Sequence, residues 1–334
     1  MNNSHVQQWV SYSKLAFTSL LIYLLLFQFN LQQMRELLNL VNPSLLVAAI
    51  FLHVAAFFCG NVRWWLLLRH VEPSCPFHKI APAYYLGLFS NNFLPTGFGG
   101  DAVRTLYLTT QGYSISKLLS SAVVDRVLGL LVLLLTGLIT ALVQETFTVD
   151  KSNMLILLVG ALAVLLSGWL LLSPTLLNWL RTHWSSTRYQ RLHRILFSLL
   201  EIFHAYRQAP WLLLSGVLLS LMLQVLVIGV YVLLGNDLNL SLPLAAYFII
   251  IPLVMLITNI PISFGGLGLR ESALVALLAG VGVDYQQGVL LSLLYLLVLW
   301  VTTLPGGLVL LLKTHPRLYA LKPSAPHSTE YMAT

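Results

Sequence analysis

Two short segments of this chain contain residues suited to binding a phosphate or carboxylate group. In the first, Gly99-Gly100 is followed by Arg104, and in the second, Gly265-Gly266 is followed by Arg270. Paired glycines expose backbone N–H groups, and a helix that begins after them points its positive end at the same place. The arginine lies about one helical turn further on and offers a fork of donors to an oxyanion. The two segments therefore predict two anion-binding turns.

The composition indicates where these turns lie. Of the 334 residues, 58% are hydrophobic and 9% are charged, whereas about 25% are charged in an average soluble domain. A soluble protein could not cover so much apolar surface, so we expect an all-α, polytopic integral membrane protein. The chain contains no P-loop, catalytic signature or metal-binding pattern. We therefore expect no enzyme activity, no metal and no cofactor.

Six apolar segments are long enough to cross a hydrocarbon core of about 30 Å. They are Lys14–Phe29, Ser44–Leu68, Ser121–Val143, Met154–Leu172, Trp211–Leu234 and Val289–Leu312.

Two further apolar segments, 81–110 and 243–283, are interrupted by proline and paired glycines, which end helices. The 14 residues of Ala81–Leu94 rise about 21 Å as a helix, which is too short to cross. Each segment therefore predicts a re-entrant helical hairpin, which enters the membrane and leaves on the same side.

The distribution of basic residues predicts the topology. If the first hairpin enters from the cytoplasm and the second from outside, thirteen basic residues, including Arg63, fall in cytoplasmic segments and two fall outside. This distribution also argues against nucleic-acid binding. The expected organisation is a cytoplasmic N-terminus (1–13), a first membrane half (14–143), a second membrane half (144–312) with an amphipathic or connecting cytoplasmic segment (173–210), and a cytoplasmic tail (313–334).

The two turns can be aligned with each other. Leu94–Arg104 and Ile260–Arg270 share Pro, Phe, Gly, Gly and Arg at equivalent positions, and an asparagine closely precedes each proline. Because the two halves are expected to have opposite orientations, the alignment predicts an inverted repeat. In transporters with this design, the substrate site lies where the broken helices meet.

Acidic residues allow a second interpretation of the arginines. Asp101, Asp125 and Glu271 could each hold an arginine in an ion pair, and Arg126 could extend to the inner interface. We favour a role in binding because ionisable groups inside membranes are costly and usually functional. His53 is interpreted as a packing residue and Pro305-Gly306-Gly307 as a kink. The predicted site comprises Asn92, Pro95, Gly99, Gly100, Asp101, Arg104, Asp125, Arg126, Asn259, Pro261, Gly265, Gly266, Arg270 and Glu271.

The motifs Asn92–Arg104, Val123–Arg126, Pro261–Glu271 and Leu304–Gly307 resemble those of the lysylphosphatidylglycerol synthase transmembrane region, also called the flippase-like domain family. The resemblance covers roughly residues 10–315. It implies a prokaryotic, lipid-handling membrane domain, which in bifunctional relatives moves aminoacylated phosphatidylglycerol between leaflets. The chain ends soon after the last span, so we expect no synthase activity.

These observations favour a lipid flippase-like protein of a prokaryotic cytoplasmic membrane, with both termini cytoplasmic. An anionic or phosphate-bearing headgroup would lie between the two turns. An alternative is a non-transporting protein that presents a polyprenyl-phosphate lipid to a separate glycosyltransferase or lipid-modifying enzyme. A third is an intramembrane enzyme that uses Asp101, Asp125 or Glu271. The sequence leaves the lipid, the energy source and any homo-oligomer open.

Overall fold

The computed structural model describes residues 41–94, 99–143, 205–260 and 262–313, with a few isolated positions elsewhere. All secondary-structure elements in these ranges are α-helices. The predicted spans 14–29 and 154–172, most of the segment 173–210, and the site residues Pro95 and Pro261 lie outside the described residues.

Four long helices form the frame of the described part. They are α3 (Pro43–Val71), α6 (Ile115–Val143), α10 (Pro210–Asp237) and α13 (Tyr285–Lys313), and each is long and apolar enough to cross a membrane. At 28 or 29 residues each, they extend about 42 Å. Four of the six predicted spans are thereby confirmed.

Local sequence determines where the frame helices begin. The Asn42 side chain accepts a hydrogen bond from the Ser44 N–H at 3.0 Å, and Pro43 occupies the first turn, where its missing N–H is not needed. Pro210 opens α10 in the same way. On the outer surface of the bundle, Phe51 is 70% exposed, as expected for a side chain that faces lipid.

Four short helices form two hairpins between the long ones. The first consists of α4 (Phe77–Asn91) and α5 (Gly99–Thr109), and the second of α11 (Leu244–Thr258) and α12 (Leu269–Ala279). Their lengths of 15 and 11 residues in both hairpins correspond to about 22 and 16 Å, which is less than the membrane core. The first hairpin begins at Phe77 rather than Ala81. The prediction began too late because the first turn of α4 contains the polar residues His78 and Lys79, which interrupt the apolar pattern.

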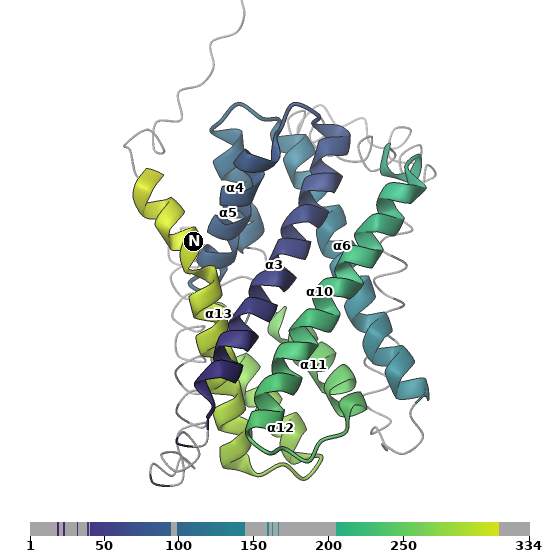
Figure 1. The fold of residues 1–334 in the computed structure, drawn as a ribbon. Helices are drawn as coiled ribbons and strands as arrows, with labels where there is room; N and C mark the ends of the chain where they lie inside the picture. The colour runs from purple at the N-terminus through teal and green to yellow at the C-terminus, as the bar shows by residue number, and fades with distance from the viewer. Residues whose placement is uncertain are drawn as a thin grey trace, which may run out of the picture.

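Helices α3 and α10 run antiparallel through the bundle. At one end the Asn42 N–H donates to Asp237 Oδ2 at 3.0 Å, and at the other the Tyr206 hydroxyl donates to the Leu67 carbonyl at 3.0 Å. Figure 1 shows the first hairpin at the upper end of the bundle and the second at the lower end. The packing is reciprocal, since α4 contacts α13 and α11 contacts α6.

The two hairpins meet near the middle of the bundle. The Gly265 N–H donates to the Leu94 carbonyl at 3.0 Å. Gly265 has a φ of 57°, and a side chain there would collide with the Asn92 carbonyl. Only glycine permits both this backbone conformation and this close approach.

Helix α13 continues through Pro305-Gly306-Gly307. A side chain at Gly306 would collide with the Tyr85 carbonyl of α4. The glycines therefore allow α13 to approach α4 closely, a role that sequence reasoning did not assign to them.

Candidate functional site

The first two turns of α5 place a carboxylate and a guanidinium on one face. Asp101 and Arg104 are three residues apart, which puts them side by side on a helix, and Arg104 Nη2 lies 2.9 Å from Asp101 Oδ1. The Arg104 guanidinium also lies over the Trp64 ring, 4.1 Å from its centroid. This aromatic face stabilises the buried cation.

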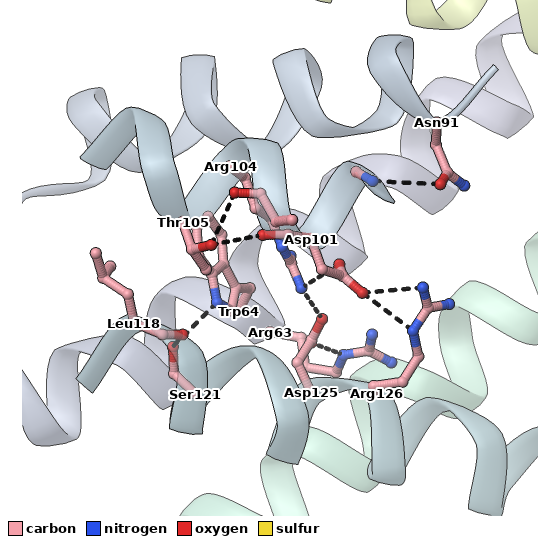
Figure 2. Close-up of polar contacts among 12 residues, drawn as sticks. Arg63, Trp64, Asn91, Asp101, Arg104, Thr105, Leu118, Ser121, Asp125 and Arg126 are labelled. Carbon is pink, nitrogen blue, oxygen red and sulfur yellow. Dashed lines mark hydrogen bonds and ion pairs between the residues drawn. The ribbon is translucent and has the colours of Figure 1, made fainter. Parts of the chain in front are cut away.

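Asp125 of α6 lies at the centre of a larger ionic cluster (Figure 2). Its Oδ1 accepts a hydrogen bond from Arg63 Nε at 2.6 Å, and its Oδ2 accepts one from Arg104 Nη2 at 3.1 Å. Arg63 also donates to Ser220 Oγ at 2.7 Å. Asp125 is only 4% exposed, so these charges are stabilised by one another rather than by water.

Arg126 connects this cluster to the second hairpin. Its Nη2 lies 2.9 Å from Asp101 Oδ2, and its Nη1 donates to Asn259 Oδ1 at the end of α11 at 3.1 Å. Of the two interpretations of Arg126, these contacts favour a place in the site over a side chain that only extends to the inner interface. The carboxylate of Asp101 and the amide of Asn259 draw its guanidinium inward.

The cluster borders a cavity of about 210 Å³. Among the described residues that line it, three are arginines (Arg63, Arg104 and Arg126) and two are aspartates (Asp101 and Asp125). Its lining thus carries a formal charge of +1. Burying ions is costly even when they are paired, and an unbalanced positive charge in an apolar bundle favours an anionic ligand.

The second hairpin presents a different environment. Arg270 Nη2 donates to Glu271 Oε1 at 2.6 Å, and Glu271 Oε2 accepts from the Gly268 N–H at 2.7 Å. The guanidinium lies 5.5 Å from the centroid of the Tyr295 ring, which stacks on Tyr231. Arg270 is thus fully neutralised by its neighbour, which also caps α12.

A second cavity of about 300 Å³ lies beside this pair. Asn91, Arg126 and Asn259 line both cavities. The two spaces are therefore adjacent, with the Arg126–Asn259 contact between them.

The structure brings most of the predicted site residues to these two cavities. Gly100, Asp101, Arg104, Asp125, Arg126 and Asn259 line the first, and Asn92, Arg126, Asn259, Gly265, Gly266 and Arg270 line the second. Gly99 is buried at the start of α5 without lining either, and Glu271 acts through Arg270. Arg104 and Arg270 both form the ion pairs expected if their role is to neutralise nearby acids. Both also line a cavity, as a role in binding requires.

Sequence reasoning missed Arg63, which it placed among the cytoplasmic residues. Arg63 lies inside α3 and is 7% exposed. The signal was present, because Arg63 falls within the apolar segment Ser44–Leu68 and a charge inside such a segment is costly. By contrast, His53 is a packing residue as expected: it is fully buried, with Nδ1 2.8 Å from Thr302 Oγ1.

These features define a class: a polytopic, all-α membrane protein whose paired broken helices meet at a buried, charged site. More particularly, the chain belongs to the lysylphosphatidylglycerol synthase transmembrane region family, whose model matches residues 12–306. It is similar to a UPF0104 membrane protein of Pyrococcus horikoshii, with 23% identity over 87% of this chain and 93% of the relative. It is also similar to a UPF0104 membrane protein of Methanothermobacter thermautotrophicus, with 24% identity over 73% of this chain and 76% of the relative.

Proposed function

We propose that this protein binds the phosphate-bearing headgroup of a membrane lipid where its two hairpins meet, and moves that headgroup from one leaflet to the other. The observation that carries the proposal is the excess positive charge of the first cavity, where three arginines face two aspartates. The acyl chains would stay in the bilayer while the headgroup passes through the cavities. Membership of a membrane family named after a phospholipid synthase supports a lipid as the substrate.

The arrangement of helices supports movement rather than binding alone. A long helix, a 15-residue helix, an 11-residue helix and a second long helix follow one another twice. The proposed inverted repeat would let each half open toward one side of the membrane. Rocking of one half against the other around a fixed site is a common mechanism in such transporters.

Membrane orientation and chemistry form part of the proposal. We place the protein in a cytoplasmic membrane with both termini cytoplasmic, on the charge distribution of the sequence. We also propose that it catalyses no reaction, since Asp101, Asp125 and Glu271 are each held by an arginine. A carboxylate held in this way is a poor general base.

Reconstitution of the purified protein into liposomes tests the proposal. Fluorescent phosphatidylglycerol in the inner leaflet becomes accessible to a membrane-impermeant quencher only when it crosses the bilayer, so the quenched fraction reports movement. The wild-type protein should raise the rate of movement well above that of protein-free liposomes. Arg126→Gln should abolish the increase, because it removes the excess charge and the contact between the two cavities.

Arg69→Gln is the matched control, because Arg69 lies in the exposed last turn of α3, away from both cavities. It should behave as wild type. A wild-type protein that binds the labelled lipid but does not move it would refute transport, and would favour the role of presenting a lipid to another enzyme. Normal movement by Arg126→Gln would refute the proposed route.

A further inference from the structure

The two adjacent cavities differ in the chemistry of their linings. The first contains all five charged groups of the ionic cluster. The second contains Arg270, already neutralised by Glu271, and the shared Arg126, and the rest of its lining is neutral, both polar and apolar. A headgroup that occupies both must therefore have two chemically distinct parts.

The first cavity contains hydrogen-bond donors that lack acceptors. Arg104 Nε and Gln224 Nε2 are buried and have no hydrogen-bond partner among the described residues, and both residues are 3% exposed. Leaving a buried donor unsatisfied is costly. An oxyanion in this cavity would supply hydrogen-bond acceptors and balance the +1 charge, whereas an ammonium group would do neither.

The second cavity is suited to hydroxyl groups. Asn91, Asn92 and Thr303 line it, and Ser263 adds a hydroxyl that is buried without a partner in the described part of the chain. No carboxylate is among the described residues lining this cavity. The Tyr295 ring, which could attract an ammonium group, already faces the Arg270 guanidinium.

We infer that the headgroup is a phosphodiester with a net negative charge that carries an uncharged polyol, such as glycerol or a sugar. The phosphate occupies the first cavity and the polyol the second, with Arg126 and Asn259 at the junction. This assignment rests on the proposed function, in that it takes the cavities to be the headgroup site. It implies that lysylphosphatidylglycerol, whose lysyl group makes the headgroup cationic, binds poorly to this member of the family.

Competition binding to the full-length protein in detergent tests the assignment without relying on transport. The protein is immobilised, and radiolabelled dioctanoyl-phosphatidylglycerol is displaced by unlabelled competitors. Unlabelled phosphatidylglycerol should compete best. The dioctanoyl forms of phosphatidic acid, phosphatidylcholine and lysylphosphatidylglycerol should each compete about tenfold more weakly. Phosphatidic acid lacks the polyol, lysylphosphatidylglycerol adds positive charge, and phosphatidylcholine differs in both respects.

Soluble sn-glycerol 3-phosphate is the competitor that distinguishes a lipid ligand from a free phosphate ester. It should fail to displace the label at concentrations at which phosphatidylglycerol displaces it fully. Equal competition by sn-glycerol 3-phosphate would overturn the lipid assignment. Equal or better competition by lysylphosphatidylglycerol would overturn the charge assignment, and absence of specific binding of the label would overturn both.

Two substitutions of uncharged residues, one in each cavity, test the phosphate and polyol positions separately. Gln224→Leu removes an unsatisfied donor from the first cavity and should weaken phosphatidylglycerol and phosphatidic acid alike, by about tenfold. Ser263→Ala should weaken phosphatidylglycerol by about fivefold and phosphatidic acid less. Ser292→Ala is the matched control, because Ser292 is equally buried but bonds within α13 to the Val289 carbonyl, and it should bind both lipids as wild type does.

The binding and liposome experiments can fail independently. Selective binding of phosphatidylglycerol without movement would leave the headgroup assignment intact and refute transport. Movement of phosphatidylglycerol and lysylphosphatidylglycerol at equal rates, with equal affinities, would support transport and refute the headgroup assignment. If a variant fails to fold, the selectivity of the wild-type protein alone still decides.

Discussion

In the ionic cluster around Asp125, an intact ion pair and a broken one have very different effects on stability. Buried ion pairs add little net stability relative to apolar packing, because desolvation offsets their attraction. Removing one partner, however, leaves an uncompensated charge. Each residue of the cluster therefore matters chiefly through the charge that its removal would leave behind.

Substitutions at Asp125 and Arg63 should differ in their effect on stability. Asp125→Asn leaves the Arg63 and Arg104 guanidinium groups side by side without their shared carboxylate, and should destabilise the fold by roughly 3–5 kcal/mol. Arg63→Gln leaves Asp125 paired with Arg104 and should be less destabilising. Thermal unfolding of the two variants in one detergent compares them, and a lower unfolding temperature for Arg63→Gln would contradict the assigned pairing.

The Arg270–Glu271 pair permits a double-mutant test. Arg270→Gln should be destabilising by several kcal/mol because it leaves Glu271 charged and 3% exposed. Adding Glu271→Gln should restore much of the loss, since the glutamine side chain can still accept a hydrogen bond from the Gly268 N–H at the start of α12. Unfolding temperatures of the wild-type, single and double variants measure the coupling. Additive losses in the double variant would show that the ion pair is not the source of the effect.

At the residue scale, the sequence predicted what lies near in the chain. Asp101 with Arg104, and Arg270 with Glu271, were recognisable as pairs because they are separated by one helical turn or less. Arg63 with Asp125, and Arg126 with Asn259, join residues far apart in the chain. Periodicity and spacing carry no information about such contacts, which depend on how whole helices pack.

At the scale of elements, the broken helices could be predicted and their partners could not. Proline, paired glycines and a short apolar run predicted both hairpins, whose bounds in the structure differ only slightly. Helix α4 packs on α13 and α11 packs on α6. To predict such contacts, one must know which helix faces meet and whether small residues lie opposite each other there. Gly306 permits the close approach of α13 to α4, and Gly87 and Gly100 permit that of α4 to α5, but only the tertiary structure reveals these partners.

The contact between α4 and α5 should be sensitive to a single methyl group. A side chain at Gly100 would collide with the Gly87 carbonyl of α4, so Gly100→Ala should destabilise the protein by about 1–3 kcal/mol. Gly288→Ala in α13 is the matched control, because its nearest neighbour would lie 3.7 Å away, an ordinary contact. The unfolding temperatures of the two variants should differ clearly. Similar values would show that α4 and α5 can separate without cost.

At the scale of the whole molecule, the two halves are connected at their tips and their ends. The Gly265–Leu94 hydrogen bond joins the hairpins at the centre of the bundle. At one end the Asn42 N–H donates to Asp237 Oδ2 at 3.0 Å, and at the other the Tyr206 hydroxyl donates to the Leu67 carbonyl at 3.0 Å. Movement of one half against the other would therefore have to change these contacts, together with the packing of α4 on α13 and of α11 on α6.

The orientation of this bundle in the membrane is the remaining prediction, and cysteine labelling tests it. Ser114 precedes α6 and Asn236 lies in the last turn of α10; both are exposed, and they lie at opposite ends of the bundle. In a background without Cys59 and Cys75, both of which are buried, a membrane-impermeant maleimide should label Asn236→Cys in intact cells. It should label Ser114→Cys only after the membrane is permeabilised, because the loop that contains Ser114 lies on the side predicted to be rich in basic residues. Labelling of both positions in intact cells would show that the two ends do not lie on opposite sides, and the proposed opposition of the hairpins would then be wrong. Labelling of Ser114→Cys alone in intact cells would mean that the two ends do lie on opposite sides but that the orientation is reversed, with the first hairpin (α4 and α5) on the outer side.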